Sequence, residues 1–125
     1  MTTRVTHSAL VFVAAAMLLV SVGSGQDPVA VAPDHYKILL ENKRVRVLEG
    51  LLKPGERTPL HSHPARVIYI LSDEKSRFTF PGGRTVDSES KAGEVVWREP
   101  TTHAEENIGT TDSHAIIVEL KEPGH

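Results

Sequence analysis

The chain has 125 residues, seven histidines and no cysteine, with 14 lysines and arginines against 16 aspartates and glutamates. A chain of this length accommodates one domain. Without cysteine, the domain folds without disulfides and can hold a metal only through nitrogen and oxygen. The mildly acidic balance, with its signs scattered along the chain, excludes a polybasic surface for nucleic acid or anionic lipid.

The first 25 residues have the layout of a secretory signal peptide. Arg4 precedes an apolar run of 14 residues, 9–22, and the small residues Gly23, Ser24 and Gly25 follow it. This is the order of a charged start, an apolar centre and a cleavage site. A membrane span needs about 20 apolar residues, so the run is too short for an anchor. We therefore expect a signal peptide over 1–25, cleavage after Gly25, export to the periplasm or the medium, and no membrane association afterwards.

The rest of the chain has the pattern of short strands. Residues 26–36 are polar, small and proline-bearing and predict a flexible lead-in, and residues 37–121 form the expected domain. Runs rich in β-branched residues alternate with turn-forming residues, which predicts strands over 35–40, 44–52, 66–71, 77–80, 94–98, 104–107 and 115–120. Regular short strands without a sustained helical period predict an all-β sandwich or barrel.

Two of the expected strands are apolar on both faces, namely residues 67–71 and 114–118. An antiparallel sheet with one solvated face alternates more cleanly between apolar and polar residues. Burial on both faces indicates that the outer side of the sheet also packs on something, and a second copy of the chain is the simplest candidate. We therefore expect a homodimer.

His61 and His63 are the first candidate metal ligands. Residues two apart in an extended chain point to the same face, about 6–7 Å apart along the strand, so both imidazoles can reach one cation. His103 opens a second expected strand and shares one face of it with Glu105 and Asn107. Of the other four histidines, His7 and His125 lie near the chain ends, and His35 and His114 near strand starts, where a solvated surface position is expected.

These residues resemble the two motifs of the cupin superfamily. Gly55 followed by His61-x-His63 is similar to the first motif, and Gly93, Pro100, His103 and Asn107 are similar to the second. The resemblance extends over roughly residues 38–120. It implies a single double-stranded β-helix barrel, related to the jelly roll, in which His61, His63 and His103 bind one divalent metal ion.

The chain departs from the family pattern at the fourth ligand. The usual first motif carries a glutamate three or four residues after its second histidine, and this slot falls here on Arg66 or Val67. The glycine near Pro100 is missing as well. Three neutral imidazoles leave the charge of a divalent ion uncompensated, which makes it a stronger Lewis acid. Three nitrogens favour Fe, Zn, Ni or Cu over Mg and Ca.

Two neighbours of the expected site have open roles. Glu105 is the candidate catalytic residue: it coordinates the ion, orients a histidine or serves as a base, unless an irregular strand turns it to solvent. Arg66 is expected to face outward, because a metal repels a buried guanidinium, and the alternative is recognition of a substrate carboxylate.

Three functions remain at this point. The first is a mononuclear metal enzyme that acts on a small organic molecule, by oxygen activation or by metal-assisted proton transfer or hydrolysis. The second is a non-catalytic cupin that binds a small molecule or a metal outside the cytoplasm. The third is a degenerate, metal-free barrel with a structural role.

Overall fold

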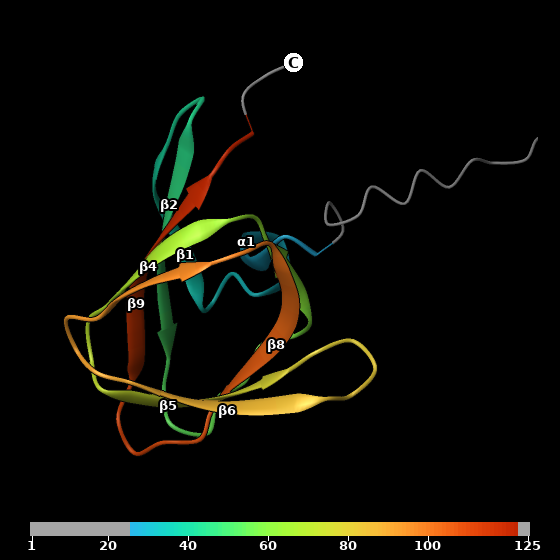
Figure 1. The fold of residues 1–125 in the computed structure, drawn as a ribbon, viewed down its shortest axis with the longest axis vertical. Coiled ribbons are helices and arrows are strands. Elements are labelled where there is room, and N and C mark those ends of the chain that lie inside the picture. The colour runs from blue at the N-terminus through green and yellow to red at the C-terminus, as the bar shows by residue number, and fades with distance from the viewer. Residues whose placement is uncertain (1–25, 123–125) are drawn as a thin grey trace, which may run out of the picture.

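The computed structural model describes residues 26–122, so the expected signal peptide lies outside the described part of the chain. The elements in chain order are α1 (Pro28–Val31), β1 (Tyr36–Glu41), β2 (Val45–Leu52), β3 (His61–His63), β4 (Arg66–Ile70), β5 (Glu74–Thr79), β6 (Thr85–Ser90), β7 (Val95–Arg98), β8 (Thr101–Asn107) and β9 (Ser113–Leu120). The predicted all-β class is confirmed (Figure 1).

Two antiparallel sheets face each other and form a barrel. The five-stranded sheet has the order β1-β2-β9-β4-β7, and the four-stranded sheet has the order β3-β8-β5-β6. In Figure 1, β5 and β6 lie at the bottom of the barrel and β4 near its top, and β2, β8 and β9 run between these two levels. The longest ladder joins β2 to β9 from opposite ends of the domain, with eight residue pairs. The fold therefore depends on contacts between residues far apart in the sequence.

The motif glycines occupy turns that other residues adopt with strain. Gly55 has a φ of 83° and Gly93 a φ of 91°, in the left-handed region where a Cβ is unfavourable. Gly55 donates its N–H to the carbonyl of Asn107, 2.9 Å away, and Gly93 donates to the carbonyl of Ile70, 2.8 Å away. Each glycine therefore ties a turn to a distant strand, and Gly55 ties its turn to β8, the strand that carries His103.

The expectation of a flexible lead-in over 26–36 has to be corrected. Residues 28–31 form the short helix α1, in which Pro28 is buried, and Ala32 and Tyr36 belong to the hydrophobic core. Proline is favoured in the first helical turn because its missing N–H would have no partner there. The small and proline-rich composition predicted a linker, but these residues cover one side of the barrel instead.

Strand β6 was missed by the sequence analysis. Its residues, Thr-Val-Asp-Ser-Glu-Ser, are mostly exposed, and it pairs with β5 at the edge of the four-stranded sheet. An edge strand with little burial lacks the apolar pattern on which strand prediction rests.

The interior is unusually polar. Among residues 26–122 the buried hydrophobic residues are Ala32, Tyr36, Leu48, Leu52, Ile70 and Ile117, whereas nine polar or charged residues are buried. Buried polar groups are costly unless they are hydrogen-bonded, so this composition points to a functional interior. Among the described residues, no helix is long and apolar enough to cross a membrane.

Candidate metal centre

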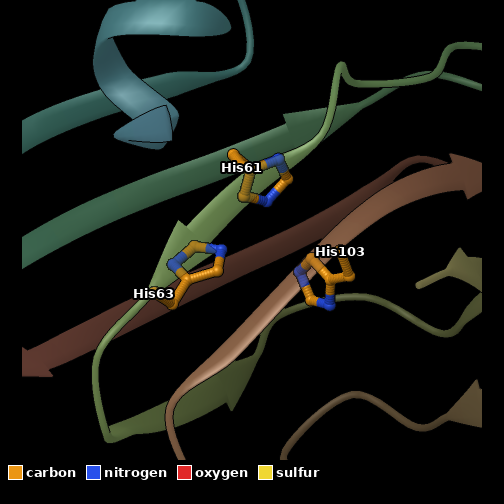
Figure 2. A group of neighbouring side chains, drawn as sticks. All are labelled: His61, His63 and His103. Atoms are coloured by element: carbon orange, nitrogen blue, oxygen red, sulfur yellow. The ribbon is translucent and has the colours of Figure 1, made fainter. Parts of the chain in front are cut away.

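Three histidines meet inside the barrel. His61 and His63 lie on β3, and His61 is paired in register with His103 on the neighbouring strand β8. Figure 2 shows the three rings facing a common space between the two strands. One ring nitrogen from each residue lies within 4.8 Å of the others, and the residues are 0, 4 and 6% exposed. The structure therefore brings together the three predicted ligands.

Hydrogen bonds at Nδ1 determine which ring nitrogen each β3 histidine offers. His61 Nδ1 donates to the carbonyl of Pro59, 2.9 Å away, and His63 Nδ1 donates to Oε2 of Glu119, 2.8 Å away. A carbonyl or carboxylate can only accept, so the proton lies on Nδ1 and Nε2 keeps its lone pair. His61 Nε2 accepts from the hydroxyl of Tyr36, 3.3 Å away. Both Nε2 atoms are thus prepared to donate to an ion.

His103 is positioned by aromatic packing. Its ring stacks on Phe78, with 4.9 Å between centroids and 28° between planes. The rings of His61 and His63 meet it edge-on at 5.0 and 5.4 Å. This packing restricts the ring without occupying either nitrogen.

Burial keeps all three imidazoles neutral. It lowers the pKa of His61 to about 4 and that of His103 to about 2, and the neighbouring histidines and Arg66 act in the same direction. Burial also lowers the pKa of His63, although the hydrogen bond to Glu119 opposes the shift. Metal ligands must be deprotonated, so these histidines need not lose a proton at neutral pH.

A carboxylate network behind His63 was missed by the sequence analysis. Glu119 is 2% exposed, and besides His63 it accepts from Nε of Arg46 at 2.8 Å. Arg46 in turn donates both of its terminal nitrogens to Asp27, at 3.0 and 2.5 Å. A carboxylate that accepts from a ligand histidine fixes its tautomer and raises its basicity. The only signal in the sequence was an acid at an inward position of an otherwise apolar strand.

Glu105 faces the interior, as the regular strand predicted. It lines an internal cavity together with His63 and His103, and its Oε1 accepts from the hydroxyl of Ser76, 2.9 Å away. Burial raises its pKa to about 7. Glu105 is not part of the histidine cluster, so its position favours a role beside the site over coordination.

The expectation that Arg66 faces outward is wrong. Arg66 is 2% exposed and lines the same internal cavity. It stands at the first position of β4, where strand alternation points it inward with Ile68 and Ile70. Repulsion between a guanidinium and an ion is real, but the pleat of the strand determines the direction of the side chain.

The donor set fits a transition metal. Within residues 26–122 the cluster contains three histidines and no carboxylate, which suits Fe, Zn, Ni or Cu. Nitrogens bound tetrahedrally at about 2.1 Å from one ion lie about 3.4 Å apart. The ring nitrogens lie within 4.8 Å of one another, so the widest pair would close by up to roughly 1.4 Å around an ion.

Comparison with solved structures identifies the fold. A cupin domain from Bordetella pertussis Tohama I superposes with a TM-score of 0.64 and 26% sequence identity, covering 70% of this chain and 92% of that one. An RmlC-like cupin with a double-stranded β-helix fold from Methanocaldococcus jannaschii superposes with a TM-score of 0.55 and 17% identity, covering 68% and 77%. A cupin superfamily protein from Desulfitobacterium hafniense DCB-2 gives 0.52 and 16%, covering 70% and 76%.

The last two similarities are too distant in sequence to indicate more than the fold. No protein-family profile matches the chain, and no curated protein is significantly similar to it in sequence. The function therefore has to be argued from the site itself.

Proposed function

Because this chain belongs to the cupin superfamily, we propose that it is a mononuclear metal protein that acts on a small organic molecule inside its barrel. His61, His63 and His103 hold the ion, and the substrate enters the adjoining cavity. The observation that carries the proposal is the convergence of three buried, neutral imidazoles on one point.

The chemistry divides between the ion and the protein. A bound divalent ion would supply Lewis acidity toward water or a substrate oxygen. Glu105 would move the proton: it lies in the cavity, is oriented by Ser76, and has a pKa raised by burial to about 7. A general base is most effective when its pKa lies near the working pH. Oxygen activation and metal-assisted proton transfer or hydrolysis both remain within this proposal.

One observation favours a second candidate, a non-catalytic binding cupin. In the described part of the chain no acidic residue joins the three histidines, so the cluster resembles a retaining site more than one built for chemistry with a carboxylate ligand. Such a site can still retain a metal or a metabolite.

Metal analysis tests the site. The purified full chain is expected to contain about one equivalent of Fe, Zn, Ni or Cu, and a variant with His61→Ala and His103→Ala is expected to contain almost none. His114→Ala is the matched control, because His114 lies on the outer side of β9, where it contacts Glu49. Substoichiometric metal in the parent, or equal metal in all three proteins, would contradict the proposal.

Turnover separates the enzyme from the binding protein. The metal-loaded chain is incubated with thiols, phenols, keto acids and sugar acids while oxygen uptake and product formation are followed. Turnover that falls at least 100-fold in Glu105→Gln supports the enzyme, since a general base contributes typically 10²–10⁴-fold. Saturable binding without turnover across the panel supports the second candidate.

Export is part of the proposal and rests on residues 1–25 alone. Cell fractionation should recover the protein outside the cytoplasm, and the amino-terminal sequence of the recovered protein should begin at Gln26. A protein that keeps Met1 and stays in the cytoplasm would contradict this part.

A further inference from the structure

The internal cavity is small and has charged residues along its length. Its volume is about 260 Å³, below the range of about 300–1,000 Å³ that is typical for drug-sized ligands. Arg66 and Arg98 line it at the end where β4 begins, and Glu74 and Ser113 line it at the end where β4 finishes. A larger open hollow of about 660 Å³ lies over Asp27 and Arg46, but it does not reach His103 and those two residues already bind each other.

Arg66 is a buried cation without an acidic partner. Its Nη1 donates to the carbonyls of Pro64 and Glu99, both at 3.3 Å. Within residues 26–122 these two carbonyls are its hydrogen-bond acceptors, and no carboxylate forms an ion pair with the group. Burial lowers its pKa to about 10. A buried charge is costly unless it is paired, so the side chain is suited to a partner that the protein itself does not provide.

Arg98 adds a second positive charge at the end of the cavity where Arg66 lies. Arg66 and Arg98 are directly opposite each other in the β4–β7 ladder, and both line the cavity. Like charges in directly opposite positions destabilise a sheet. The one hydrogen bond of the Arg98 side chain within the described residues goes to the carbonyl of its neighbour Trp97, at 3.2 Å. An anion between the two guanidinium groups would remove this repulsion.

The acid opposite Arg66 on the neighbouring strand β9 already binds other residues. Glu119 is opposite Arg66 in the β4–β9 ladder, but its carboxylate oxygens accept from His63 and Arg46. It attracts Arg66 at longer range without a hydrogen bond. Glu119 therefore leaves the charge of Arg66 without an ion pair, and His63 lines the same cavity beside it.

We propose that Arg66 and Arg98 bind the carboxylate of a small carboxylic acid whose other end lies at the site formed by His61, His63 and His103. This assignment rests on the proposed function, and it names the substrate class of that site. A guanidinium offers two parallel donors that match the two oxygens of a carboxylate. The arginine in the usual position of the motif glutamate thus serves substrate recognition in place of metal binding.

The glutamates Glu74 and Glu105, which also line the cavity, favour a ligand with a carboxylate over one with a phosphate. A phosphate group carries close to two negative charges, and in a cavity of this size it would lie near Glu74 and Glu105. A carboxylate carries one charge and leaves the rest of the molecule to contact the apolar walls. The class is therefore a short acid with a small apolar or polar tail.

Calorimetric titration of the metal-loaded full chain tests the assignment. The probes are three acids, propionate, benzoate and succinate, each beside its neutral amide, and inorganic phosphate. At least one acid is expected to bind ten times more tightly than its amide, and Arg66→Gln is expected to weaken that acid tenfold or more. Arg98→Gln should weaken it to a smaller extent, because Arg98 is exposed. Arg77→Gln is the matched control, since Arg77 is exposed and binds Asp87, and it should change nothing.

A stability measurement guards against a merely structural effect. Removal of an unpaired buried cation should leave the melting temperature of ligand-free Arg66→Gln unchanged or raise it, whereas removal of a structural arginine lowers it. If Arg66→Gln fails to fold, the guanidinium is structural and the assignment is overturned for Arg66. Equal binding of acids and amides, tighter binding of phosphate than of any acid, or unaltered binding in both Arg66→Gln and Arg98→Gln would overturn it as a whole.

Titration after metal removal distinguishes this failure from failure of the proposed function. The arginine pair should still bind the acid in the chelated protein, with an affinity reduced by the lost contact to the ion. Acid binding without any metal binding would contradict the proposed function alone, and metal binding without acid selectivity would contradict this inference alone.

Discussion

The two faces of the five-stranded sheet both depart from the pattern that is usual for a small domain. The inner face carries the buried charged residues Arg66 and Glu119, together with the half-buried Arg46. The outer face carries exposed apolar side chains, among them Trp97 at 49% and Leu40 at 50% exposure. A sheet that merely covered a core would have these two sets the other way round.

The outer apolar residues form a continuous row. The register pairs Trp97 with Val67, Val67 with Val118, Val118 with Val47, and Val47 with Leu40, so one residue of every strand takes part. Contiguous exposed apolar surface on a soluble protein marks an interaction site more often than chance. We therefore propose that the inner face serves a ligand and expect the outer face to serve a partner, and the two can be tested separately.

Glu119 should show the largest effect on the inner face. Glu119→Ala leaves the Nδ1–H of His63 and part of Arg46 without an acceptor inside the barrel. Breaking a buried pair in this way costs about 3–5 kcal/mol of the free energy of unfolding. Urea denaturation measures it. Glu49→Ala is the matched control, because Glu49 also contacts a histidine, His114, but on the outer face, and it should cost less than about 1 kcal/mol.

The same residue should control metal affinity. The isosteric Glu119→Gln keeps a hydrogen bond to His63 but removes the charge, and losses of this kind weaken metal binding by about 10–100-fold. Competition with a chromogenic chelator measures the dissociation constant. Equal affinity in parent and variant would mean that the network supports only the fold.

Glu105 should make the inner face sensitive to pH. Its pKa is raised from 4.5 to about 7 by burial, so the folded state binds more protons between these values and its stability is lost as pH rises through 7. His61 acts in the opposite sense, because its pKa is lowered to about 4 and its contribution is lost as pH falls from about 6.5. The two effects partly cancel in the parent chain.

The substitution Glu105→Gln separates the effect of Glu105 on stability from that of the histidines. In the presence of a chelator, the variant should gain on the order of 3 kcal/mol relative to the parent between pH 5 and pH 8, while the histidine effect is common to both. Denaturation at the two pH values measures the difference. Parallel pH profiles would show that the carboxyl is not desolvated.

Tyr36 should have a smaller effect, of about 1 kcal/mol. Its hydroxyl donates to Nε2 of His61, the nitrogen that would bind an ion, so this hydrogen bond must break on metal binding. Tyr36→Phe should therefore tighten metal binding about fivefold, in line with a net hydrogen bond of about 1 kcal/mol. Weaker binding, with loss of a phenolate absorption band in the iron- or copper-loaded parent, would instead make Tyr36 a ligand.

The sequence predicted the parts of the site that follow a local pattern. His61 and His63 share a face because residues two apart in a strand do so, and the same rule placed Glu105 beside His103. The turn glycines Gly55 and Gly93 were recognisable for the same reason, since the backbone at each position is local.

What the sequence did not predict depends on contacts across the fold. Glu119 meets His63 from 56 residues away, and Asp27 reaches Arg46 from a segment whose composition predicted a linker. Arg66 was expected to avoid the interior on electrostatic grounds, but its strand position placed it there. Pairing over such distances is determined by topology, which composition and periodicity do not describe.

The outer row should have the smallest effect on stability and a clear effect on assembly. The expected homodimer remains a prediction, and this row gives it a defined place. Val118 lies on β9, the central strand of the sheet. Val118→Lys puts a charge at the centre of the row, and a charge buried without a partner at an interface prevents association. Sedimentation should then change from dimer to monomer.

The control for Val118→Lys is a substitution that keeps the shape of the valine side chain. Val118→Thr keeps the β-branch and adds only a hydroxyl, so it should leave the dimer largely in place. Since the row is partly exposed in the single chain, either substitution should change the free energy of unfolding at high dilution by no more than about 0.5 kcal/mol, and metal content should not change. A parent chain that sediments as a monomer at all concentrations would remove the second copy as the partner. The apolar outer face would then have to be matched to a different protein.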